Sequence, residues 1–99
     1  MTARGTILVV EDDDELRQTL ADLLADEGYH VVCASNGREG LDALAAVQAS
    51  LVLLDLVMPE MSGQDVYAAM QADPRLADIP VIVCTSDPSR TPPGLLTLK

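Results

Sequence analysis

Two short apolar runs, each ending on carboxylates, place the strongest constraint on what this chain can fold into. Residues 7–10 (Ile-Leu-Val-Val) lead directly into Glu11 and Asp12, and residues 51–54 (Leu-Val-Leu-Leu) lead into Asp55. Runs this short and this uniformly apolar are typical of strands buried in a parallel sheet. Because ligands of open α/β sheets bind at the carboxyl ends of the strands, we expect these three acids to converge on one crevice.

The rest of the chain alternates strand-like and helix-like segments. Leucines at positions 16, 20, 23 and 24 recur at helical spacing, and Gly28 follows them where a left-handed helix cap is expected. Right-handed crossovers turn such an order into a doubly wound parallel sheet, here in one α/β domain over residues 1–99. We expect strands at 6–10, 29–34, 51–55, 80–84 and 95–98, with helices between the first four.

Charge and composition exclude several classes of function. Six basic against sixteen acidic side chains give a net charge of -10, which repels nucleic acid phosphates, so this segment is not expected to bind DNA or RNA. The chain has only two aromatic residues, Tyr29 and Tyr67, and therefore lacks stacking surfaces for bases or sugars. No apolar run is long enough for a membrane span or a signal peptide, which predicts a cytoplasmic protein without membrane contact.

The two cysteines do not point to metal or redox chemistry. Cys33 and Cys84 lie in separate strand-like runs and form no CxxC pair. We expect both to be small buried hydrophobic side chains in a reducing compartment.

The predicted acidic crevice suits a hard divalent cation. Three neighbouring carboxylates repel one another unless a cation joins them, and oxygen ligands of this kind favour Mg²⁺. A carboxylate beside Mg²⁺ can act as a nucleophile toward phosphorus. Asp55 closes a buried strand, which costs desolvation unless a partner offsets it. The acids at positions 13–15 are better explained as a solvated turn that caps a helix.

Two further side chains end strand-like runs at the same edge. Thr85 follows residues 81–84, and Lys99 follows residues 95–98. Taken alone, Thr85 is explained by its strand propensity and Lys99 as a solvated terminal residue. Their predicted convergence with the acids makes them candidates for contacting a phosphoryl group.

The combination of motifs resembles the receiver domain of bacterial two-component response regulators. Residues 7–13 (Ile-Leu-Val-Val-Glu-Asp-Asp) resemble its first acidic motif. In residues 53–63, Asp55 is followed by Pro59 and Gly63 at the spacing of its phosphoacceptor motif, and residues 80–86 resemble its hydroxyl-bearing strand. Residues 27–29 and 34–37 also match, so the resemblance covers about residues 6–86.

This resemblance implies a flavodoxin-like sheet with strand order 2-1-3-4-5 and a phosphoacceptor function. Asp55 would take a phosphoryl group from a phosphohistidine on a sensor histidine kinase or a phosphotransfer protein. The domain would not be an enzyme, although it would assist its own phosphorylation and dephosphorylation. Thr85 and Lys99 would contact the phosphoryl group, with the backbone N–H groups of residues 56 and 86. Mg²⁺ would be bound by Asp12, Asp55 and the backbone carbonyl of Val57, with Glu11 acting largely through water.

The sequence departs from this family beyond Thr85. Residues 86–94 contain three prolines, so we expect a loop in place of the fourth helix, and we expect the family's last helix to be absent. The Lys99 position matches less closely, because the family's lysine precedes a proline. The uncovered surface of the fifth strand could be covered by continuation of the native chain or by a second copy in a homodimer.

Other functions remain open at this point. A receiver-like protein-binding module that acts without phosphorylation is the main alternative. An Mg²⁺-dependent phosphotransferase or nuclease would want a second acid at position 57, where this chain has valine. Flavin binding is weaker still, because no Ser/Thr-rich phosphate loop follows the first strand.

Overall fold

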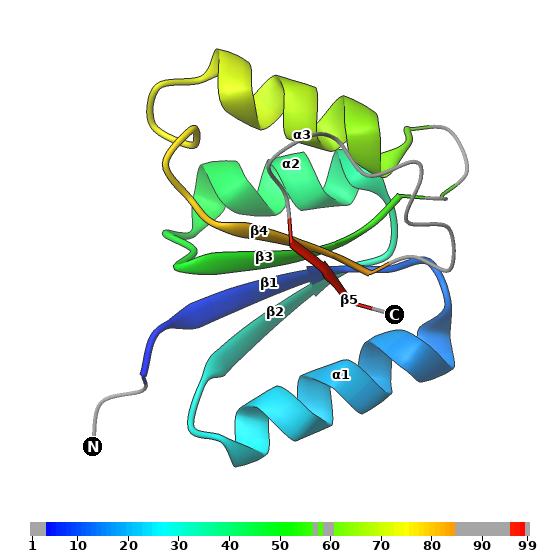
Figure 1. Cartoon of the computed structure of the whole chain (residues 1–99). Helices are drawn as coiled ribbons and strands as arrows, with labels where there is room; N and C mark the ends of the chain where they lie inside the picture. Colours follow the sequence, from blue (N-terminus) through cyan, green and yellow to red (C-terminus); the bar gives the residue numbers. More distant parts are fainter. Residues whose placement is uncertain (1–3, 57, 59–60, 85–95, 99) are drawn as a thin grey trace.

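A five-stranded parallel sheet forms the centre of the molecule (Figure 1). The structure is a computed structural model that describes residues 4–56, 58, 61–84 and 96–98. Its elements in chain order are β1 (Thr6–Val10), α1 (Asp14–Asp26), β2 (His30–Ala34), α2 (Gly37–Ala46), β3 (Leu51–Asp55), α3 (Gly63–Ala72), β4 (Val81–Cys84) and β5 (Leu96–Leu98).

The strand order β2-β1-β3-β4-β5 confirms the predicted topology. All four neighbouring pairs are parallel, and β1 lies between β2 and β3, with Leu8 opposite both Val32 and Val52. Helix α1 covers one face of the sheet, and α2 with α3 covers the other (Figure 1). The fold is therefore the doubly wound α/β architecture expected from the sequence.

Alternation along β1 explains why its apolar run has no polar interruption. Leu8 and Val10 belong to the core beneath α2 and α3, whereas Ile7 and Val9 belong to the core beneath α1. All four are at most 2% exposed. Successive side chains of a strand point to opposite faces, so a strand covered on both faces needs apolar residues at every position.

Side-chain caps begin all three described helices close to the carboxyl ends of the strands. Asp13 accepts from the backbone N–H of Leu16 at 3.0 Å, and Asn36 caps α2 in the same way. Ser62 and Asp65 form a reciprocal capping box at the start of α3. Gly28, with a φ of 95°, ends α1 in the left-handed region, as predicted. These caps satisfy backbone N–H groups and hold the loops that precede the helices.

Two local expectations were wrong or incomplete. Cys33 is exposed rather than buried, because β2 is an edge strand of the sheet. Among the leucines of α1, Leu20 and Leu24 pack against the sheet, but Leu16 and Leu23 are 43% and 60% exposed. Helical spacing therefore identified α1 without identifying which of its leucines are covered.

Part of the prediction lies outside the described residues. This applies to the proline-rich replacement of the fourth helix, and to Val57, Thr85 and Lys99. The absence of the last helix stays a prediction. Among the helices that the structure describes, none has the length and apolar character needed to cross a membrane.

Candidate functional site

The register of β1 and β3 brings the predicted acids together. Val10 lies opposite Leu54, so Glu11 and Asp55 follow at adjacent positions on the two strands. One carboxylate oxygen from each of Glu11, Asp12 and Asp55 lies within 4.8 Å of the others. The predicted convergence of the three carboxyl groups is therefore confirmed. They gather at the carboxyl edge of the sheet, where β1 and β3 end.

Glu11 is the buried member of this cluster, with 5% of its surface exposed. Burial raises its pKa to about 8; the backbone N–H of Asp13, which donates to Oε2 at 3.2 Å, opposes this rise. The side chains of Asp55 and Asp12 also raise the pKa of Glu11. Without a cation, burial and the neighbouring carboxyl groups therefore favour the protonated form of Glu11.

The donor set fits a divalent cation such as Mg²⁺. It contains oxygen atoms only, and its three carboxyl groups are close enough to share one ion. Asp12 is exposed and Asp55 is half-buried, so the cluster is open to water that could complete the coordination. A cation bound here would supply the positive charge that the proton on Glu11 supplies without it.

Gly63 allows α3 to begin directly against the end of β3. Its N–H donates to the carbonyl oxygen of Leu56 at 3.1 Å. A Cβ atom at position 63 would overlap the carbonyl oxygen of Asp55 and lie 2.7 Å from the Cα of Leu56. Only glycine fits this approach. The position of Gly63 in the motif thus has a steric basis next to Asp55.

Arg17 contacts the backbone of this site, which the sequence did not predict. Its Nη1 donates to the backbone carbonyl of Glu11 at 2.8 Å, and its Nη2 pairs with Asp14. The sequence does hold a signal, because Arg17 is the only Lys or Arg between Arg4 and Arg38 and follows five consecutive acids. That pattern indicates that Arg17 offsets part of the acidic charge, but it does not predict a hydrogen bond from the guanidinium to the Glu11 carbonyl.

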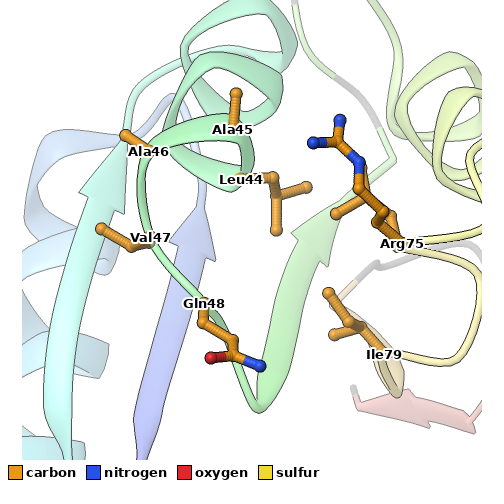
Figure 2. A pocket seen from close by; sticks show the side chains of 8 residues that line it. Leu44, Ala45, Ala46, Val47, Gln48, Arg75 and Ile79 are labelled. Atoms are coloured by element: carbon orange, nitrogen blue, oxygen red, sulfur yellow. The ribbon is translucent and has the colours of Figure 1, made fainter.

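A groove lies at the opposite edge of the sheet from the acidic cluster, and Figure 2 shows side chains that line it. It lies between the end of α2 and the segment that precedes β4, and Leu44, Arg75 and Ile79 are among its lining residues. These segments come before the strands β3 and β4, whereas the acids follow β1 and β3. The groove therefore takes no part in the candidate site.

Comparison of the sequence with known families gives one clear match. Residues 7–91 match the response regulator receiver domain. A curated relative, Response regulator RR06 of Streptococcus pneumoniae, is 39% identical over 80 residues, which cover 81% of this chain and 36% of that protein. The chain thus spans about a third of the length of this relative.

Solved structures show the same architecture. The N-terminal domain of a response regulator receiver protein from Methanoculleus marisnigri aligns with a TM-score of 0.84 and 38% identity, covering 91% of this chain and 72% of that one. The response regulator TrrA from Thermotoga maritima, solved in complex with Mg²⁺ and BeF, aligns with a TM-score of 0.77 and 34% identity, covering 84% and 70%.

Proposed function

Because the chain belongs to the response regulator receiver family, we propose that it is a phosphoacceptor switch that is phosphorylated on Asp55. Receiver domains are signalling domains rather than classical enzymes. The observation that carries the proposal is the gathering of Glu11, Asp12 and Asp55 at the end of two neighbouring strands. This cluster combines a nucleophilic carboxylate with a cation site, which phosphoryl transfer requires.

In the proposed reaction, a carboxylate oxygen of Asp55 attacks the phosphorus of a phosphohistidine on a histidine kinase or a phosphotransfer protein. A new oxygen–phosphorus bond forms, the nitrogen–phosphorus bond breaks, and the imidazole nitrogen keeps the bonding electrons and takes up a proton. Hydrolysis by water later returns Asp55 to a carboxylate and releases phosphate. Asp55 is half-buried at a strand end, so it is positioned on a rigid element and still open to a partner.

We assign the cation site to four residues. Asp12 and Asp55 would bind Mg²⁺ directly, Glu11 would act largely through water, and Val57 would contribute its backbone carbonyl. Bound Mg²⁺ would neutralise the charge that develops on the phosphoryl oxygens.

The phosphoryl oxygens would be held by Thr85, Lys99 and the backbone N–H groups of Leu56 and Ser86. A phosphoryl group adds about -1.5 to -2 charge and three strong acceptor oxygens. Contacts of this kind would draw Thr85 toward Asp55 and reorder the neighbouring loops. The domain would therefore assist its own phosphorylation and dephosphorylation.

Intact-mass spectrometry tests the proposal directly. The protein is incubated with Mg²⁺ and a small phosphodonor, and the unsubstituted chain should gain the mass of one phosphoryl group. Asp55→Asn should gain none, whereas Asp26→Asn, which removes an exposed carboxylate of α1, should react like the unsubstituted chain. An adduct that persists in Asp55→Asn would refute the assignment, and no adduct with any donor or partner kinase would favour a phosphorylation-independent binding module.

The wider context of this domain also belongs to the proposal. We take residues 1–99 as a receiver domain whose C-terminal part is incomplete relative to the family, acting in the cytoplasm without binding nucleic acid. β5 is a sheet edge, and pairing of two copies through its surface is a prediction that sedimentation analysis can check.

A further inference from the structure

Arg17 is not one of the three acids of the cluster, but its side chain contacts the backbone of Glu11. We propose that Arg17 is a positioning residue that holds the loop of residues 11–13 in the conformation that binds the cation. This inference rests on the proposed Mg²⁺ site and adds a residue to it. Its basis is the 2.8 Å hydrogen bond from the guanidinium to the backbone carbonyl of Glu11.

Hydrogen bonds hold the loop on both sides of Asp12. On one side, the N–H of Glu11 donates to the carbonyl of Ala34 at 3.0 Å, and its carbonyl accepts from the Arg17 side chain. On the other side, the backbone N–H of Arg17 donates to the carbonyl of Asp13 at 2.9 Å. The Arg17 side chain therefore holds one neighbour of Asp12, and the first backbone bond of α1 holds the other, while Asp12 itself remains exposed.

The guanidinium is well suited to this task. Its side chain is only 19% exposed, so water competes weakly for its hydrogen bonds. The planar fork reaches Glu11 and Asp14 at once, which a lysine ammonium on its flexible chain does less well. Asp14 is the main cause of the raised pKa of Arg17, and the neighbouring Glu39 contributes in the same direction.

Glu39, in the first turn of α2, holds the next loop at this edge of the sheet. It accepts hydrogen bonds from the N–H and the hydroxyl of Ser35, at 2.8 and 2.7 Å. These bonds lower the pKa of Glu39, and the positive charge of Arg17 lowers it as well. The guanidinium therefore contacts the loop that follows β1, and it acts on the loop that follows β2 only through its charge.

Substitution of Arg17 should change Mg²⁺ affinity in opposite directions, depending on whether the residue positions the loop or acts only through its charge. A cation near a cation site repels the ion, so removing the charge of Arg17 would by itself tighten binding. Loss of the hydrogen bond to Glu11 would instead loosen the ligand loop and weaken binding. Residues that orient metal ligands typically change metal affinity by about tenfold or more when they are substituted. The sign of the change therefore separates the two roles.

The experiment compares Mg²⁺ affinity by isothermal titration calorimetry in Arg17→Met, Arg17→Lys and Arg75→Met. Arg75→Met is the matched control, because it removes the same charge from the groove at the opposite edge of the sheet. We expect Arg17→Met to bind Mg²⁺ about tenfold more weakly, Arg17→Lys to fall between, and Arg75→Met to match the unsubstituted protein. Far-UV circular dichroism checks that each variant folds, and Arg17→Lys serves as the test if Arg17→Met does not.

The outcomes distinguish this inference from the function on which it rests. Unchanged or tighter Mg²⁺ binding in the folded Arg17 variants would overturn the positioning role and leave the phosphoacceptor proposal intact. A loss of thermal stability without a change in affinity would do the same, since it would show a merely structural role. Absence of Mg²⁺ binding in the unsubstituted protein would overturn both.

Discussion

Replacement of Gly63 by alanine should be among the most damaging single-methyl additions to this protein. The added Cβ would overlap the carbonyl oxygen of Asp55 and lie 2.7 Å from the Cα of Leu56 and 2.9 Å from the carbonyl carbon of Asp55. Ordinary contacts of a Cβ begin near 3.4 Å. These obstacles are backbone atoms of β3 and its exit, so no side-chain rotation can relieve the overlap, and the start of α3 must move away from the strand.

The size of the effect follows from two contributions. Overpacking at a rigid site costs about 1–3 kcal/mol, and separation of α3 from β3 weakens the 3.1 Å bond from the Gly63 N–H to Leu56, worth about 1 kcal/mol. We expect the free energy of unfolding to fall by about 3 kcal/mol. In a domain of this size, that corresponds to a decrease in melting temperature of about 12–24 °C.

Gly37 provides a matched comparison, because it is the first residue of α2 just as Gly63 is the first residue of α3. A Cβ at position 37 would lie 2.8 Å from side-chain atoms of Met61 and Val66. Met61 is half-buried and flexible and can move aside, whereas Val66 is fully buried and cannot. Because both obstacles are side chains rather than backbone, Gly37→Ala should cost about 1–2 kcal/mol, less than Gly63→Ala.

Urea unfolding followed by circular dichroism gives both values. A Gly63→Ala variant that loses less than about 1 kcal/mol, or no more than Gly37→Ala, would show that the steric reasoning is wrong. Under conditions where both variants are folded, only Gly63→Ala should also slow formation of the Asp55 adduct, because the overlap displaces the backbone of Asp55 itself.

Three further predictions concern pH, capping and the core. Glu11 has a raised pKa in the folded state, so its stabilising contribution is complete below its ordinary value of 4.5 and is lost as the pH rises through about 8. Thermal melts in chelator should therefore show falling stability over this pH range, and the fall should be smaller in Glu11→Gln but unchanged in the exposed control Glu15→Gln. An equal fall in all three proteins would contradict the assignment. Ser62→Ala removes half of the capping box and should lower the free energy of unfolding by about 1 kcal/mol in urea titrations, whereas no change would mean that the cap is not formed in solution. Met70→Ala empties a site that is 0% exposed and should cost about 2–5 kcal/mol, while Leu23→Ala, at a 60% exposed position, should cost less than about 0.5 kcal/mol; similar losses would contradict the packing.

The sequence predicted the parts of this fold that depend on local pattern. The apolar runs at 7–10 and 51–54 identified β1 and β3, since a strand buried on both faces needs apolar side chains throughout. Strand order came from the family resemblance rather than from any local pattern. Alternation placed a helix between the second and third strands, and the cap at Asn36 sets its start at Gly37.

What the sequence missed depends on contacts between distant segments. Cys33 lies in an apolar stretch and was expected to be buried, but burial depends on whether a strand is central or at the edge, and β2 is at the edge. The contact of Arg17 with the Glu11 carbonyl depends on the path of the loop, which no residue pattern reports. The roles of Thr85 and Lys99 remain predictions.

The central place of β1 has a consequence for how the protein is made. This strand is made before the other four strands of the sheet, yet its two neighbours are β2 and β3, so it has no partner on its second side until Asp55 has been synthesised. Until then, β2 can pair with one side of β1 and α1 and α2 are already present, but the side of residues 7–10 that pairs with β3 stays open and α3 is still missing from the cover. We therefore expect the nascent chain to be most prone to aggregation and to chaperone capture before residue 55 emerges, and to lose that tendency soon afterwards.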